Sequence, residues 1–267
     1  MIFCKRVYGT ARMAIVSQLE YRFNLFVDTC LQPILLCVSE IALWTAIFRG
    51  GGVETLNGFT REYYFAYALW AAFFARIAAN WMYEMRMIDE IDSGSVNSVL
   101  VRPISFYEYY LGQFMGYKVL TSLFSLLVPV LICALVPSST HLLRLPIAFL
   151  LSLYYLILAH TLSSIVSSFA FFFNRIHALT VTKNFILWFL VGELFPLDLL
   201  PANIRSLIIS LPFSSGVYIP VGYLTGRLPI ESVWKGFFSV TIGILIFSVI
   251  YYFTWSMGRK RYSGTGA

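Results

Sequence analysis

The chain has 267 residues, of which 59% are hydrophobic and only 12% are charged, about half the charged share of a soluble globular domain. So few charges cannot cover the surface of a soluble fold of this length. The net charge is +6, and we attribute the excess of basic residues to the short cytoplasmic segments of a membrane protein. We therefore expect no nucleic-acid partner.

The apolar residues come in blocks that predict an all-α membrane protein with six transmembrane helices. The blocks are about 20 residues or longer, the length that crosses a bilayer as a helix, and they lack the polar–apolar alternation of a membrane barrel. The predicted six-helix domain is residues 23–257, with a Gly-rich turn at residues 50–52. Its spans are residues 23–48, 63–83, 109–136, 146–173, 178–194 and 233–257.

The two ends of the chain are predicted to lie on the cytoplasmic side. Residues 1–22 mix apolar and basic side chains and predict an interfacial helix, with a solvated extension as the alternative. Residues 258–267 form a cytoplasmic tail. In this orientation twelve Lys and Arg residues, Lys118 and Lys183 among them, fall inside and six fall outside. This bias predicts a multi-pass protein of the cell membrane (inner or plasma membrane) with both termini inside.

Residues 84–108 form the longest charged segment, between the second and third spans. Their pattern predicts a short amphipathic helix on the cytoplasmic face that ends at Ser93-Gly94. The apolar stripe consists of Met85, Ile88 and Ile91, and the outward acidic residues are Asp89, Glu90 and Asp92. Such a helix could dock onto a partner protein, and a solvated loop is an equally supported alternative.

Ionisable residues in or near spans are costly in lipid and are therefore functional candidates. Arg76 and His160 are predicted at similar depth, Glu40 lies too far outside to pair with Arg76, and Glu193 is expected at the outer interface. The predicted translocation-path residues are Arg76, His160, Ser164 and Ser168. Helix packing is an equally supported role for them.

Small residues mark predicted packing faces, because they let helices approach closely. Gly112 and Gly116 form a GxxxG pair at the start of the third span. Alanines line the second span at three-residue and four-residue spacing, at Ala68, Ala72, Ala75 and Ala79. We interpret both faces mainly as helix contacts.

Residues 195–229 are too apolar for a free loop and too interrupted by proline for a span. Pro201 is expected to start a short helix at residues 202–211. Broken apolar elements at membrane depth must be covered by protein or line a cavity, so we predict short re-entrant helices between spans five and six. The alternative is an interfacial loop without a transport role.

No motif of an enzyme or metal centre is present. The sequence has no GxxxxGK[ST] phosphate loop, no HExxH and no GxSxG. Its four cysteines lie in or beside apolar stretches without CxxC spacing, and we interpret them as small hydrophobic residues. We expect no catalytic, metal-binding or cofactor-binding residue, with a membrane enzyme of unfamiliar motif as a disfavoured alternative.

Two segments resemble the permease subunits of ABC-2 type ABC transporters, in an order and topology that cover nearly the whole chain. SGSVNSVLVRPIS is similar to the family's Gly, apolar stretch and "(L/V)xRPxS" turn, formed here by Arg102, Pro103 and Ser105. GELFPLDLLPANIRSLIISLPFSSGVYIPVGYLTGRLP is similar to the family's outer segment. The matching positions there are Gly192, Pro196, Pro201, Leu211, Pro212, Phe213, Tyr218, Pro220 and Gly226.

The resemblance implies a short six-span permease that is paired with a separate phosphate-loop ATPase, which binds the ATP and Mg. Residues 85–98, with Arg102, would contact this ATPase, and the turn at residues 174–177 could also transmit its motion. The outer re-entrant element would be built around Pro196, Pro201, Pro212, Phe213 and Pro220. A second permease chain, identical or related, would complete the path.

The function expected from the resemblance is ATP-driven export of amphipathic or lipid-like compounds, such as a drug, toxin or glycolipid. The alternative is a secondary transporter or channel that is not coupled to ATP. Such proteins often have internal repeats and charges near the midplane. We find no clear repeat in the sequence and expect the candidate charges not to cluster.

Overall fold

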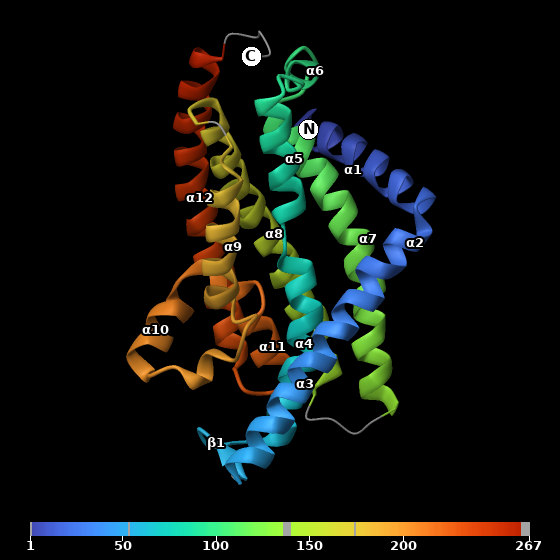
Figure 1. The fold of residues 1–267 in the computed structure, drawn as a ribbon, viewed down its shortest axis with the longest axis vertical. Helices are drawn as coiled ribbons and strands as arrows, with labels where there is room; N and C mark the ends of the chain where they lie inside the picture. The colour runs from blue at the N-terminus through green and yellow to red at the C-terminus, as the bar shows by residue number, and fades with distance from the viewer. Residues whose placement is uncertain (1, 53, 136–139, 174, 263–267) are drawn as a thin grey trace.

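The computed structural model describes residues 2–52, 54–135, 140–173 and 175–262, and these are almost entirely helical. Most helices run along one long axis, with both chain ends near one end of the molecule (Figure 1). The predicted end of the third span at Val136, the link residue Asn174 and residues 263–267 of the predicted tail lie outside the described ranges.

Four helical segments are long and apolar enough to cross a membrane, and they correspond to the first, third, fourth and sixth predicted spans. The segments are Arg22–Gly51, Phe106–Leu135, Leu142–Phe171 and Ile230–Arg261. The first combines α2 (Arg22–Phe26), a π-helical turn (Val27–Leu31) and α3 (Gln32–Gly51). The others are α7 (Phe106–Leu135), α8 (Leu145–Ser168) between two 3-10 turns (Leu142–Arg144, Phe169–Phe171), and α12 (Ile230–Arg261).

The second predicted span is interrupted. α4 (Arg61–Ala78) stops where Ala79 takes an extended conformation, with a ψ of 132°, and α5 (Trp81–Asp92) begins after Asn80. The Asn80 side-chain amide donates to the Ala159 carbonyl at 3.2 Å and to the Ser163 hydroxyl at 3.0 Å, which holds the break against α8. The short helix predicted for the cytoplasmic stretch is the second half of α5, which starts inside the predicted span and ends at Asp92, directly before Ser93-Gly94.

The fifth predicted span is α9 (His177–Val191), which has only 15 residues. At 1.5 Å per residue it is about 22 Å long, shorter than a hydrocarbon core of about 30 Å. Six crossings therefore remain a prediction. Short elements follow α9 and precede α12. They are two 3-10 turns (Leu197–Leu199, Pro212–Ser215), α10 (Ala202–Ser210) and α11 (Tyr218–Leu224).

A small β-hairpin lies at the end of the molecule opposite the termini, where only a Gly-rich turn was expected. β1 (Thr55–Leu56) pairs antiparallel with β2 (Phe59–Thr60). Asn57 and Gly58 both have positive φ, 50° and 80°, the conformation that a tight hairpin turn requires and that Asn-Gly tolerates. The predicted turn at residues 50–52 is also placed differently, because α3 continues through Gly51 before Gly52 ends it at a φ of 58°.

The N-terminal helix α1 (Ile2–Glu20) packs on α7 through the GxxxG pair. A Cβ added at Gly112 would lie 1.8 Å from the Thr10 hydroxyl oxygen, and one at Gly116 would lie 2.3 Å from the Ala11 carbonyl oxygen. The two glycines therefore allow the backbones to approach. The position of α1 at the membrane surface remains a prediction.

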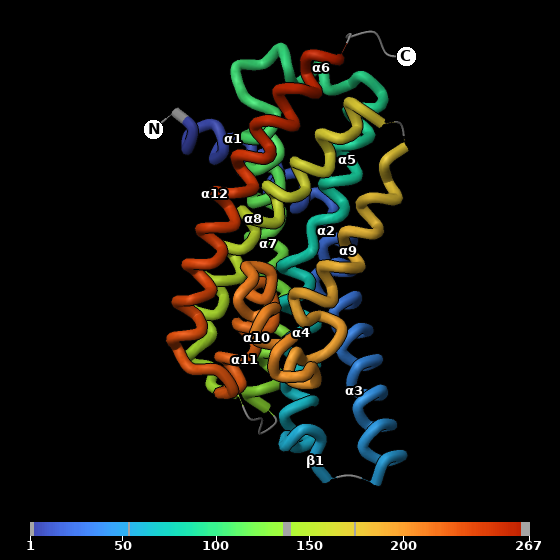
Figure 2. The backbone as a smooth tube through the Cα atoms, turned by 90° about the vertical axis from the view of Figure 1, so that its left-hand side faces the viewer, coloured from blue at the N-terminus to red at the C-terminus, as the bar shows by residue number. Residues whose placement is uncertain are grey.

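α4 is the centre of the bundle, where it packs against α3, α7, α8 and α11, and Figure 2 shows it partly behind α10 with α3 at its side. Its aromatic side chains are almost fully buried, including Tyr64, Trp70 and Phe73. A second apolar cluster lies at the end near the termini and joins α5, α6 (Asn97–Leu100) and the start of α7. The core thus consists of a large central cluster and a smaller one at the predicted cytoplasmic end.

Candidate functional site

An ion pair links the π-helical turn to the end of α4. The Arg76 guanidinium lies 2.8 Å from the Asp28 carboxylate, and its Nε donates to the Asp28 carbonyl at 3.0 Å. The Tyr117 hydroxyl of α7 donates to the same carboxylate at 2.7 Å. In the π register Gln32 bonds to Val27, so Pro33, which has no N–H, leaves the Asp28 carbonyl free for Arg76.

Lys118 adds a second cation to this cluster. Its side chain is only 3% exposed, and its Nζ donates to the Arg76 carbonyl at 2.7 Å. That carbonyl lacks a backbone donor because α4 breaks three residues later. Lys118 lies about 18 Å from the start of α7, and its assignment to the cytoplasmic residues stays a prediction. The expectation that the charges do not cluster is wrong.

Arg76 also lines a groove of about 220 Å³ between α3, α4 and α9. Small alanines of α4 and two tryptophans form much of its wall. The lining residues are Gln32, Pro33, Leu36, Ala72, Ala75, Arg76, Ala79, Trp81, Trp188 and Glu193. The groove thus combines an apolar, aromatic wall with charged groups.

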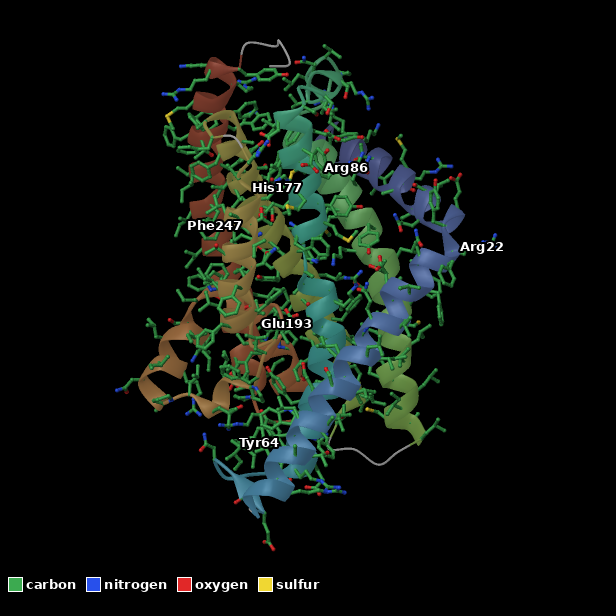
Figure 3. All side chains as sticks on the ribbon, in the orientation of Figure 1. Arg22, Tyr64, Arg86, His177, Glu193 and Phe247 are labelled. Carbon is green, nitrogen blue, oxygen red and sulfur yellow. The ribbon has the colours of Figure 1, made fainter. Side chains whose placement is uncertain are left out.

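Glu193 lines this groove, and its expected position at the outer interface stays a prediction. Figure 3 shows it between Arg22 and Tyr64 along the long axis. α9 is short, and Gly192 ends it with a φ of 82° while Tyr67 donates to the Gly192 carbonyl at 2.6 Å. Within the described ranges the Glu193 carboxylate has no hydrogen bond or ion pair, and only the backbone N–H of Glu193 bonds, to the Trp188 carbonyl at 3.0 Å. Glu193 is the one carboxylate among the described residues that line the groove.

His160, Ser164 and Ser168 are buried in the packing between α7 and α8 and do not line the groove. The His160 Nε2 lies 3.2 Å from the Tyr107 carbonyl. Ser164 and Ser168 donate to backbone carbonyls of α8 at 2.9 and 2.7 Å. Of the predicted path residues, the structure brings only Arg76 to the groove.

A hydrogen-bonded contact and an ion pair join α5 to α9, which lie side by side in Figure 2. Near the termini, Asp89 lies 2.9 Å from His177, and both side chains are well exposed. Deeper in the molecule, Lys183 bonds to Glu84, whose side chain is fully buried. Lys183 was also expected among the cytoplasmic residues. Its side chain is only 11% exposed and pairs with Glu84 inside the protein.

The predicted coupling residues divide into a buried and an exposed group. Ile88 is fully buried in the protein's own core, and Met85 is half-buried. Asp89 and Asp92 are exposed. Partial desolvation of the Asp92 carboxylate raises the pKa of Asp92, and the nearby His177 opposes this shift.

The other two coupling residues interact locally. The Glu90 carboxylate pairs with Arg86 at 3.4 Å, one turn earlier on α5. The Arg102 guanidinium lies over the Tyr109 ring, 5.7 Å from its centroid, and the Arg102 side chain is exposed. The surface that a partner protein could reach at this end is therefore charged, and it rests on the apolar cluster of α5 and α6.

The segment between α9 and α12 is organised around Asp198, which the sequence analysis missed. This carboxylate is 2% exposed and accepts hydrogen bonds from Tyr63 at 2.8 Å and Tyr218 at 3.1 Å. It also pairs with Arg227 at 3.1 Å and Arg205 at 3.5 Å. A single acidic residue in an apolar, proline-rich stretch was the available signal.

The prolines of this segment shape its short elements. Pro196 precedes the 3-10 turn Leu197–Leu199, Pro201 precedes α10, Pro212 opens the second 3-10 turn and Pro220 lies in the first turn of α11. The Phe213 ring packs 6.2 Å from Phe247 of α12. The expected short helices are present, and whether they enter the bilayer remains a prediction.

Within the described ranges, no group of three or more His, Cys, Asp or Glu side chains could hold a metal ion. A family model described as "ABC-2 family transporter protein" matches residues 34–266. A search among curated proteins found no match to this chain. The matched range contains the groove residues of α4 and α9, whereas α1 and Asp28 precede it.

Proposed function

Because the chain belongs to the ABC-2 transporter family and is a permease component of an ABC transporter, we propose that it exports amphipathic or lipid-like compounds with the energy of a separate ATPase. The ATPase would bind ATP and Mg, and it would contact this chain near α5 and α6. The observation that carries the proposal is the pair of links between α5 and α9. They connect a surface that a partner can reach with a wall of the groove.

The geometry supports a route for this motion. Asp89 and Asp92 offer a charged surface at the exposed end of α5. A displacement of α5 would act on α9 through the buried Glu84–Lys183 pair, which resists separation because an isolated buried charge is costly. It would also act on α4 across the break at Asn80. Because α4 and α9 both line the groove, one displacement of α5 would change the width of the groove.

The groove supports an amphipathic cargo. Trp81 and Trp188 give it a large apolar surface, and Glu193 gives it a polar group at mid-depth. A volume of about 220 Å³ is below the range of about 300–1,000 Å³ that encloses a drug-sized ligand. We propose that a second permease chain, identical or related, covers this open side and completes the path.

The proposal is tested by reconstituting the chain with a candidate phosphate-loop ATPase. Vesicles should move a fluorescent amphiphile only when ATP and Mg are supplied. Asp89→Ala should lower the amount of ATPase that co-purifies, because it alters the exposed α5 surface. Glu62→Ala is the matched control, since Glu62 is an equally exposed acidic residue at the opposite end of the molecule.

Transport driven by an ion gradient without ATP would contradict the proposal and would favour the secondary transporter or channel. Equal co-purification of the ATPase with both variants would contradict the assignment of the contact surface to α5.

A further inference from the structure

An open cleft of about 770 Å³ lies between α10, α11 and the start of α12, apart from the groove described above. In Figure 1, α10 lies toward the end opposite the chain termini. The residues that give the cleft its chemistry are Arg205, Ser206, Ile219, Ser232, Lys235 and Phe238. Ser210 and Ser239 also line it, so the cleft has two cations, four serine hydroxyls and several apolar side chains.

The charge of this region is positive and partly uncompensated. Arg205 shares the Asp198 carboxylate with Arg227, so two guanidinium groups face one buried anion. Lys235 is exposed and has no ion pair or hydrogen bond within the described part of the chain. Glu231 lies one helical turn before Lys235 but does not come within ion-pair distance of it. An anion would therefore find an unused cation here.

The helix ends around the cleft add to this preference. α10 and α12 both begin at the cleft, and neither has a side-chain cap on its first turn. Free N–H groups at a helix start favour a nearby anion. They support the cations without making a site by themselves.

The depth of these groups matches the parts of a lipid. Along α12, Lys235 is about 7.5 Å from the first residue, Ile230, and Phe238 is about 12 Å from it. A cation above an apolar floor matches a charged headgroup above an acyl chain. Ile204 and Leu207 of α10 expose further apolar surface to the surroundings.

We propose that this cleft binds an anionic phospholipid of the leaflet opposite the termini. The headgroup phosphate accepts hydrogen bonds from Lys235 and Arg205, and the serines bind its polar end. An acyl chain lies along Ile209 and Phe238. This inference does not rest on ATP coupling or on the proposed cargo, so it can fail independently of them.

The test is lipid binding to the purified full-length chain, measured by native mass spectrometry with phosphatidylglycerol or phosphatidylcholine. The chain should retain phosphatidylglycerol in preference to phosphatidylcholine. Lys235→Gln should weaken phosphatidylglycerol binding about fivefold, and Lys235→Arg should restore it. Lys235 leads the test because it makes no contact that the fold needs, and an unchanged thermal unfolding curve would show this.

Arg49→Gln is the matched control, since Arg49 is another exposed cation at the same end of the molecule. It should leave phosphatidylglycerol binding unchanged. An equal loss in both variants would overturn the proposal, because it would show attraction to surface charge in general. Displacement of the lipid by millimolar inorganic phosphate would also overturn it, since the cleft would then hold a free anion.

Discussion

Asp28 and Arg76 show how a buried charge is stabilised in an apolar bundle. Each ionised group has more than one partner, since Arg76 bonds to both the carboxylate and the carbonyl of Asp28. Tyr117 satisfies the remaining carboxylate oxygen, and Lys118 satisfies the Arg76 carbonyl. Such saturation is what makes a charge tolerable at this depth.

We predict that Arg76→Gln lowers the free energy of unfolding by about 2 kcal/mol. The loss is smaller than for breaking a fully buried pair, because both side chains of this pair are partly exposed. The change leaves the Asp28 carboxylate without its counter-ion. Denaturant titration of the purified chain in detergent measures the effect. Asp28→Asn in the same chain should recover part of the loss.

The control for this prediction is Arg6→Gln. Arg6 lies 3.6 Å from Glu108 in a pair whose arginine side chain is 41% exposed. Exposed pairs contribute less than about 1 kcal/mol, so this change should cost less than Arg76→Gln. Equal losses in the free energy of unfolding would show that the Asp28–Arg76 pair stabilises the fold no more than an exposed pair does.

At the scale of helices, the contact between α1 and α7 depends on the absence of a side chain. We predict that Gly116→Ala loosens α1, because the added Cβ would lie 2.3 Å from the Ala11 carbonyl oxygen and the backbone would have to shift. Hydrogen exchange of the α1 amides, read by mass spectrometry, should become faster.

Gly9→Ala is the matched substitution, since no atom lies within 4 Å of a Cβ added at Gly9. It should leave exchange unchanged or slower, because alanine favours helix by about 1 kcal/mol over glycine. Equal exchange in the two variants would contradict the close approach of α1 and α7.

Hydrophobic blocks and proline positions predicted α7, α8, α10 and α12 within a few residues, because these features depend on the local sequence. The break between α4 and α5 could not be predicted in this way. Asn80 is held there by Ala159 and Ser163 of α8, about eighty residues away in the chain. The π-helical turn at Asp28 likewise depends on Arg76, which no local pattern indicates.

The charged residues at and near the groove were predicted only in part, again because their partners are distant in the sequence. Arg76 was identified because a lone arginine in a span is conspicuous. Lys118 and Lys183 were assigned to cytoplasmic segments because their partners, the Arg76 carbonyl and Glu84, are distant in sequence. The place of Glu193 in the groove was not predicted, because the short length of α9 becomes evident only in three dimensions.

At the scale of the whole molecule, α5 and α9 form a unit that extends from an exposed end to the central groove. We predict that Glu84→Gln with Lys183→Met lowers ATP-driven transport roughly tenfold or more, within the usual range of coupling between sites. Removing both charges avoids an unpaired buried carboxylate. Transport in vesicles, with ATP hydrolysis measured in parallel, separates lost coupling from lost ATPase binding.

Arg86→Gln serves as the control on the same helix. It removes an exposed pair with Glu90, which contributes about 0.3–0.5 kcal/mol, and transport should stay near the wild-type rate. If the double variant also kept the wild-type rate, the route through α5 and α9 would be wrong.

The break between α4 and α5 has an electrical consequence. A helix carries about half a negative charge at its C-terminal end and about half a positive charge at its N-terminal end. α4 ends and α5 begins beside the groove, so two opposite backbone poles face each other there, with Lys118 at the negative pole. These poles do not titrate. The side chains that line the groove therefore lie in a local field that does not depend on their protonation.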